Sequence, residues 1–189
     1  NGPDLAILDV IRDNQVNFLK LTPSHLALLS DEDLRDSQVR TMIVGGEDFK
    51  TELASRIQAV VGSQLSIYNE YGPTEATVGC VIHPYNVEED HGRSVPIGQA
   101  SPNMGFYLLD PAGHMVPQGV IGELYLVGQG LAQAYWQRVD LSAERFPLNP
   151  FTEQGRMYKT GDLARINHRG QVEYLGRIDD QVKLDGRRI

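Results

Sequence analysis

The order of strand-like and helix-like segments is the feature that most constrains the fold of this chain. In residues 1–84, short apolar runs typical of strands alternate with segments whose apolar residues recur at helical spacing. Thr22-Pro23 is a typical helix start, with a threonine N-cap followed by proline at the first helical position. Strands are predicted at 16–21, 39–44 and 65–68, and helices at 5–11, from 22 onward and over 53–60. Strands separated by helices indicate parallel α/β units.

After residue 84 the pattern changes. A polar, acidic loop at 87–94 leads into strand-like runs that follow one another without helices between them. Turn residues such as 110–113 and 167–170 separate these runs. The runs are 106–109, 123–127, 162–166 and 172–175. This order is typical of an antiparallel sheet or a distorted barrel.

Composition excludes several classes of protein. The chain has 189 residues, of which 41% are hydrophobic and 22% charged, as in an ordinary globular domain. No apolar stretch approaches the roughly 18 residues that cross a bilayer, so no membrane partner is expected. A net charge of −8 argues against nucleic acid as the main partner. Cys80, the single cysteine, lies in the strand-like run 78–82, where we expect a buried thiol in a cytoplasmic protein.

Several common cofactor sites are also excluded by the motifs that are missing. The phosphate loop GxxxxGK[ST] does not occur, and Gln133 stands where the dinucleotide fingerprint beginning at Gly128 requires glycine. The five histidines are scattered, with no HExxH motif. A nicotinamide enzyme and a histidine-held metal site are therefore not expected.

Three dense polar segments remain as candidate sites: 69–75, 158–162 and 176–183. The first follows the predicted end of a strand, where ligand crevices of parallel sheets open. It combines an amide, an aromatic ring, a hydroxyl and two carboxylates. From the residues alone, an ordinary polar turn explains this segment equally well.

Taken together and in order, these segments resemble the adenylation domain of non-ribosomal peptide synthetases. That domain belongs to the adenylate-forming superfamily, with acyl-CoA synthetases and luciferases. The resemblance extends over essentially the whole chain, and Pro73 is typical of members that activate amino acids. Further matching motifs are Gly45-Gly46-Glu47, Gly122-Glu123-Leu124, Gly130-Leu131-Ala132, Tyr135-Trp136 and Glu144-Arg145-Phe146.

The resemblance implies an α/β fold, the second half of the large N-terminal domain of an adenylate-forming enzyme. Residues 1–84 are expected to form an α/β segment that carries the nucleotide and substrate loops, and 85–176 a distorted antiparallel β-barrel subdomain. Residues 177–189 are expected to form the hinge and the start of a small C-terminal domain. We expect a piece of a longer protein, because the family's phosphate loop lies upstream and its catalytic lysine downstream.

The resemblance also implies a reaction. The carboxylate of an amino acid attacks the α-phosphate of ATP with Mg²⁺ present, pyrophosphate leaves, and AMP carries the acyl group. The acyl group then passes to the phosphopantetheine thiol of a peptidyl carrier domain. A condensation domain of the same synthetase is a further expected partner, and antibiotic biosynthesis in secondary metabolism the expected context. Such chemistry requires positioning and neutralisation of phosphoryl charge.

Roles for individual residues come from the same resemblance. The ring of Tyr71 is expected to stack on adenine, the Asn69 amide to reach its edge, and Asp162 to accept both ribose hydroxyls. Thr74 is expected to donate to the α-phosphate, and Glu75 to bind Mg²⁺. The expected nucleotide-binding residues are Gly45, Gly46, Glu47, Asn69, Tyr71, Gly72, Thr74, Asp162, Tyr174 and Arg177. The expected catalytic residues are Thr74, Glu75 and Lys183, with Asp179 at the hinge.

Alignment with the family's motifs also places six residues around the side chain of the amino acid. These are Lys20, Ile43, Gly45, Glu70, Val78 and Gly79. Lys20 offers a donor and Glu70 an acceptor, which together suit a neutral carboxamide and favour L-Asn. An ion pair between Lys20 and Glu70 that only closes the pocket is the alternative. Two other functions stay open: a piece of an acyl- or aryl-CoA ligase, and a non-catalytic nucleotide-binding module.

Overall fold

The computed structural model of the protein describes residues 6–152, 155–179, 183–184 and 187–188. The chain divides into two compact units. Residues 6–70 and 83–96 form most of the first unit, and residues 71–82 and 97–179 form the second. The domain boundaries expected from the sequence, at 84 and 176, stay predictions.

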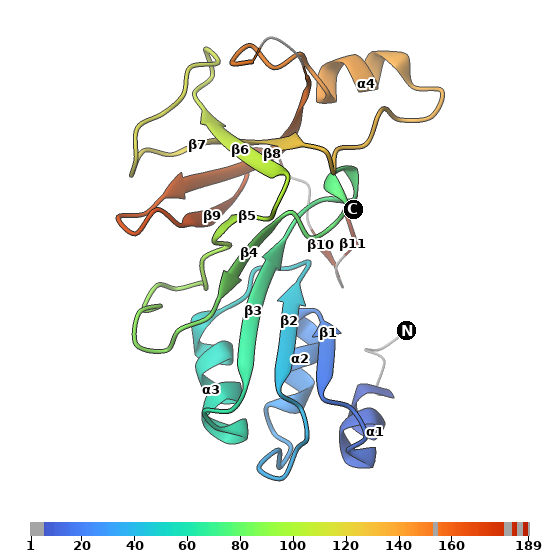
Figure 1. The fold of residues 1–189 in the computed structure, drawn as a ribbon, viewed down its shortest axis with the longest axis vertical. Coiled ribbons are helices and arrows are strands. Elements are labelled where there is room, and N and C mark those ends of the chain that lie inside the picture. The colour runs from blue at the N-terminus through green and yellow to red at the C-terminus, as the bar shows by residue number, and fades with distance from the viewer. Residues whose placement is uncertain (1–5, 153–154, 180–182, 185–186, 189) are drawn as a thin grey trace. The chain divides into compact units, whose positions relative to one another are not determined.

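The first unit alternates helices and strands, as its sequence predicts. Its elements are α1 (Ala6–Asp13), β1 (Phe18–Leu21), α2 (Pro23–Leu29), β2 (Thr41–Gly45), α3 (Thr51–Val61) and β3 (Ser66–Tyr71). β2 pairs in parallel with both β1 and β3, and the helices lie alongside these strands (Figure 1). The predicted N-cap is confirmed, since the Thr22 side chain accepts a hydrogen bond from the backbone N–H of His25 at 3.3 Å.

One face of this sheet forms the core of the first unit. Leu19, Met42 and Ile67 are paired across the strands and are buried against apolar side chains of α2 and α3, such as Leu26 and Ile57. Because side chains alternate along a strand, the intervening residues face the other way. That second face carries the half-buried or exposed positions of all three strands.

Several strand boundaries differ from the sequence-based predictions by two residues or more, and two of these differences lie beside predicted site residues. The strand predicted to end at 68 continues to Tyr71, because Asn69 and Tyr71 are buried in alternation with Ile67. The strand predicted at 78–82 begins only at Val81, as β4 (Val81–Pro84). The earlier start was wrong because Val78 and the residue before it adopt left-handed backbone angles, with φ values of 64° and 60°.

The second unit is built mainly from antiparallel strands. β6 (Met104–Leu109), β7 (Gly122–Gly128), β8 (Met157–Ile166) and β9 (Val172–Arg177) form a four-stranded sheet in that order. The unit also contains the 3₁₀ turn η1 (Thr74–Ala76), β5 (Gln99–Ala100) and α4 (Val139–Arg145).

Two further sheets complete the strand pairing of the described residues. One is five-stranded, in the order β1-β2-β3-β4-β5, and in the other β10 (Lys183–Leu184) pairs with β11 (Arg187–Arg188).

The core of the second unit lies on the antiparallel sheet. Leu124, Leu126, Tyr158 and Val172 are buried there, together with Cys80, whose side chain is buried as predicted. The α/β class is confirmed. Among the described residues the antiparallel strands run in the order β6-β7-β8-β9, and an isolated antiparallel bridge also joins Val172 of β9 to Gly98. No helix in the described part of the chain is long and apolar enough to cross a bilayer.

Candidate functional site

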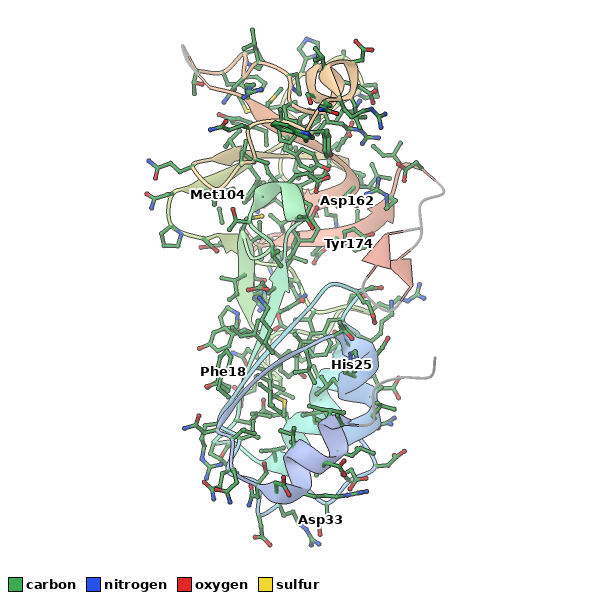
Figure 2. The ribbon with its side chains drawn as sticks, turned by 90° about the vertical axis from the view of Figure 1, so that its right-hand side faces the viewer. Phe18, His25, Asp33, Met104, Asp162 and Tyr174 are labelled. Carbon is green, nitrogen blue, oxygen red and sulfur yellow. The ribbon has the colours of Figure 1, made fainter. Side chains whose placement is uncertain are left out.

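The most buried polar group among the predicted site residues is the carboxylate of Asp162, on β8 (Figure 2). This residue is only 2% exposed, and both of its oxygens accept hydrogen bonds. Oδ1 accepts from Nη1 of Arg177 at 3.0 Å, and Oδ2 accepts from the hydroxyl of Tyr71. Burial, followed by the negative charge of Asp162, raises the pKa of Tyr71 well above its ordinary value, so this hydroxyl is a neutral donor.

Arg177 connects the Asp162 carboxylate to the predicted hinge residue. Its Nε and Nη2 donate to the two oxygens of Asp179 at 2.6 and 2.8 Å, a bidentate pair. Its Nη1 also donates to the carbonyl of Thr160 at 3.1 Å. The hydrogen bonds to Asp179 are the main cause of a raised pKa for Arg177. The structure therefore brings the predicted ribose ligand, Arg177 and Asp179 together.

The two tyrosines predicted to lie near the nucleotide are also neighbours. The ring centroids of Tyr71 and Tyr174 are 6.3 Å apart, at an interplanar angle of 36°. Tyr71 is 7% exposed, so little of its ring is available for stacking. Its stacking on adenine stays a prediction.

The loop after β3 carries the predicted catalytic hydroxyl and carboxylate. Thr74 is exposed at the start of η1, and Oε1 of Glu75 accepts a hydrogen bond from the Tyr135 hydroxyl at 2.6 Å. Burial and this bond to Glu75 raise the pKa of Tyr135. A side chain at Gly72 would place its Cβ 2.0 Å from the carbonyl oxygen of Val78, so glycine is needed where the loop closes. A β-branched residue at positive φ, such as Val78, marks local backbone strain.

The carboxylate of Glu75 is compatible with binding of Mg²⁺. No group of three or more His, Cys, Asp or Glu side chains among the described residues could hold a metal ion alone. Mg²⁺ usually keeps several waters and takes only one or two carboxylates plus substrate phosphates. The single carboxylate of Glu75 fits that pattern, as a ligand for an ion that arrives with ATP.

The first unit contains the charged pair predicted to recognise the substrate. Nζ of Lys20 lies 2.6 Å from Oε2 of Glu70, and their side chains are 51% and 13% exposed. Lys20 is paired in register with Ile43, and Gly45 with Glu70. These four residues share the sheet face opposite the helix-covered core. A Cβ at Gly45 would come within 2.5 Å of the Glu70 carbonyl oxygen, so only glycine leaves the two strands this close.

Two predicted nucleotide-binding residues of the first unit have structural contacts that the sequence did not predict. Oε2 of Glu47 accepts from the backbone N–H and the hydroxyl of Ser24 at 3.1 and 2.5 Å, at the first turn of α2. The Asn69 amide donates to the carbonyls of Val95 and Pro96 at 2.9 and 3.0 Å and is 3% exposed. Gly46, which lies between the end of β2 and Glu47, has a φ of 90°. Contact of Asn69 with an adenine edge stays a prediction, and its NH₂ group already has two acceptors.

The remaining predicted residues are only partly placed. Val78 and Gly79 belong to the second unit, whereas the other four residues assigned to the amino-acid pocket belong to the first. The pocket as a set of six residues therefore stays a prediction. Lys183 lies in β10. Tyr135, which contacts Glu75, was found as part of a motif but received no role from the sequence.

A family model for AMP-binding enzymes matches residues 2–136. The chain belongs to this family of AMP-binding enzymes. The matched range includes the strand and loop from Asn69 to Glu75 and the segment from Gly130 to Tyr135. Asp162 and Arg177 lie beyond the matched range.

Relatives and solved structures extend the similarity to the rest of the chain. It is 49% identical to bacitracin synthase 3 of Bacillus licheniformis and 47% identical to tyrocidine synthase 3 of Brevibacillus parabrevis, over 97% of its length in each comparison. It spans 3% of each of those two proteins. The solved holo form of PA1221, a non-ribosomal peptide synthetase protein with adenylation and PCP domains, is 30% identical and has a TM-score of 0.90. That match covers all of this chain and 33% of PA1221. The predicted resemblance to adenylation domains is confirmed.

Proposed function

We propose that this chain is part of an adenylation domain that activates an amino acid as its aminoacyl-AMP for non-ribosomal peptide synthesis. The observation that carries the proposal is the buried carboxylate of Asp162, held by Tyr71 and Arg177 in the same unit as Glu75. Buried charges are costly to maintain, so a carboxylate at 2% exposure indicates a site built around it. A non-catalytic module has no need for this carboxylate together with a hydroxyl and a second carboxylate in the loop at Thr74 and Glu75.

In the proposed reaction, each residue acts on one part of the nucleotide. The two oxygens of Asp162 offer about four acceptor positions, and Tyr71 and Arg177 occupy one on each oxygen. The ribose hydroxyls donate to the same two oxygens. The Thr74 hydroxyl donates to an α-phosphate oxygen, and Lys183 contributes a cation near the phosphates. A substrate carboxylate oxygen then bonds to the α-phosphorus, and the bond to the pyrophosphate oxygen breaks. Glu75 is the residue that binds Mg²⁺, which supplies neutralisation of phosphoryl charge when bound.

For the amino acid, we propose L-Asn. The supporting observation is that Nζ of Lys20 and Oε2 of Glu70 lie 2.6 Å apart and thus present a donor beside an acceptor. The oxygen and nitrogen of a carboxamide are separated by about 2.2 Å, from standard amide bond lengths. Edge-on binding forms two hydrogen bonds, one to each side chain, without separating the ion pair.

This arrangement also explains which analogues bind less well. An aspartate side chain has two acceptor oxygens, and Glu70 repels it. Gln has the same amide on a chain one methylene longer, a difference worth roughly 10- to 200-fold in a shaped pocket. The ion pair that only closes the pocket is compatible with the same distance, so substrate measurements are needed to separate the two interpretations.

The experiment is amino-acid-dependent pyrophosphate exchange with the complete adenylation domain that contains these residues, assayed with all twenty amino acids. We expect L-Asn to give the highest kcat/KM, with Asp and Gln lower. Highest activity with an apolar amino acid or with Asp would contradict the assignment of Lys20 and Glu70. No exchange with any amino acid, but thioester formation from fatty or aryl acids and CoA, would identify an acyl- or aryl-CoA ligase.

The acceptor of the acyl group is proposed to be the phosphopantetheine thiol of a peptidyl carrier domain, with a condensation domain as the next partner. The similarity to PA1221, which contains adenylation and PCP domains, supports the first of these partners. We also propose a cytoplasmic location, consistent with a sequence whose single cysteine cannot form an internal disulfide.

A further inference from the structure

The segment from Gly130 to Tyr135 contacts the loop of Thr74, Glu75 and Thr77 at three points. The hydroxyl of Thr77 donates to the carbonyl of Gly130 at 2.6 Å, and the backbone N–H of Ala132 donates to the carbonyl of Glu75 at 2.8 Å. The third contact is the hydrogen bond at 2.6 Å from the Tyr135 hydroxyl to Oε1 of Glu75. The first contact anchors the side chain of Thr77, the second holds the backbone of Glu75, and the third holds the Glu75 carboxylate itself. We call residues 130–135 the loop clamp.

Tyr135 is itself held by the helix that follows it. The backbone N–H of Tyr135 donates to the hydroxyl of Ser142 on α4 at 3.0 Å. Its ring packs edge-on against Phe146 with centroids 5.5 Å apart, and its hydroxyl lies 3.5 Å from that of Tyr158. A half-buried tyrosine fixed at its backbone, ring and hydroxyl has few rotamers available. The direction in which it presents its hydroxyl to Glu75 is therefore set by the fold.

We infer that Tyr135 is a positioning residue that holds the Glu75 carboxylate in the orientation required to bind the divalent cation, and that the loop clamp exists to support this contact. The inference rests on the proposed function, because it takes Glu75 as the metal ligand. Hydrogen-bond partners of metal ligands orient the ligands, and their loss typically lowers metal affinity by about 10- to 100-fold. Tyr135 touches neither substrate nor metal in this account.

A purely structural role is the competing explanation, and Tyr135→Phe separates the two. The substitution keeps the ring that packs on Phe146 and removes only the hydroxyl. Tyr125 provides a matched control, because its hydroxyl also donates to a glutamate in the same unit, Oε2 of Glu123 at 3.4 Å. Tyr125→Phe removes a tyrosine hydroxyl of β7 whose hydrogen bond is to Glu123 and not to Glu75.

The test measures binding of Mn²⁺ to the complete adenylation domain by electron paramagnetic resonance, with a non-hydrolysable ATP analogue present. For Tyr135→Phe we expect the apparent Kd for Mn²⁺ to rise by about tenfold or more. Binding of the analogue without metal and the melting temperature should change little. Tyr125→Phe should bind Mn²⁺ as the unmodified domain does. An unchanged Mn²⁺ affinity in Tyr135→Phe would overturn the inference.

A second variant protects the test if Tyr135→Phe does not fold. Thr77→Ala removes the anchor on Gly130 from an exposed position and should weaken Mn²⁺ binding in the same direction, by less. Unchanged binding in a folded Thr77→Ala domain would then overturn the inference. Glu75→Gln separates this inference from the proposed function: if it leaves Mn²⁺ binding intact, the metal role of Glu75 is wrong. If Glu75→Gln abolishes binding while Tyr135→Phe has no effect, only the positioning role is wrong.

Discussion

The two ion pairs at the predicted sites differ in how deeply they are buried. In the first unit, the side chains of Lys20 and Glu70 are 51% and 13% exposed. In the second unit, those of Arg177 and Asp162 are 6% and 2% exposed. An exposed pair contributes little to stability and rearranges easily, whereas removing one partner of a buried pair is strongly destabilising. The first pair therefore suits the recognition of variable substrates, and the second suits an invariant ligand such as the nucleotide.

The largest effect on stability and on ATP binding is expected from Asp162→Ala, which removes one partner of the buried pair, in the complete adenylation domain. Removing one partner of a buried pair costs about 3–5 kcal/mol, and the second contact of Arg177 with Asp179 places the expected loss near 3 kcal/mol. Where the variant is folded, the KM for ATP should rise at least tenfold, while the KM for the amino acid changes much less. Urea unfolding and pyrophosphate exchange measure the two effects.

Asp162→Asn is the matched control, because it keeps the shape and one acceptor oxygen. A destabilisation below about 1 kcal/mol for Asp162→Ala, the size typical of a surface pair, would contradict the buried arrangement. An unchanged KM for ATP would show that the ribose is bound elsewhere.

Asn69→Ala tests a buried polar contact of the first unit. The substitution removes two hydrogen bonds to the carbonyls of Val95 and Pro96, at about 1 kcal/mol each, and leaves both carbonyls without this donor. We expect a loss of roughly 2 kcal/mol in the free energy of unfolding. If nucleotide affinity falls while stability is unchanged, the amide acts on adenine, as the resemblance implies, more than on the backbone.

Two glycines give a direct comparison of backbone packing in the two units. A Cβ at Gly72 would lie 2.0 Å from a backbone oxygen in the second unit, and one at Gly45 would lie 2.5 Å from a backbone oxygen in the first. Alanine at either position should cost about 1–3 kcal/mol, with Gly72→Ala the more severe. Gly92→Ala is the control, because its nearest neighbour would be 3.4 Å away. Thermal unfolding measures all three, and equal stability of the Gly72 and Gly92 variants would contradict the close approach.

The sequence predicted the fold better than it predicted contacts within the sites. Helical spacing and apolar runs predicted the parallel strands of the first unit, and ordered motifs singled out Asp162 and Glu75 as candidate site residues. The bond between Tyr135 and Glu75 was out of reach, because 60 residues separate them and nothing in either segment encodes the pairing. The late start of β4 was missed because the apolar residues from Val78 resemble a strand, whereas closure of the loop against Gly72 forces positive φ there. Long-range packing and loop closure thus override local pattern where the predicted sites lie.

The smallest effect on stability is expected from Lys20→Met. This substitution should instead change which amino acid the domain prefers. Methionine keeps an unbranched apolar stem like that of lysine and removes the cation, so the free energy of unfolding should change by less than about 1 kcal/mol. The amide oxygen of Asn then loses its donor, which costs about 1–3 kcal/mol, or roughly a 5- to 150-fold fall in kcat/KM. Glu70→Gln makes the complementary change: removing the negative charge should raise activity with Asp relative to Asn. Pyrophosphate exchange with Asn, Asp and Gln measures both variants. If both keep the substrate order of the unmodified domain, the Lys20–Glu70 pair only closes the pocket, and the preference for Asn has no basis in these residues.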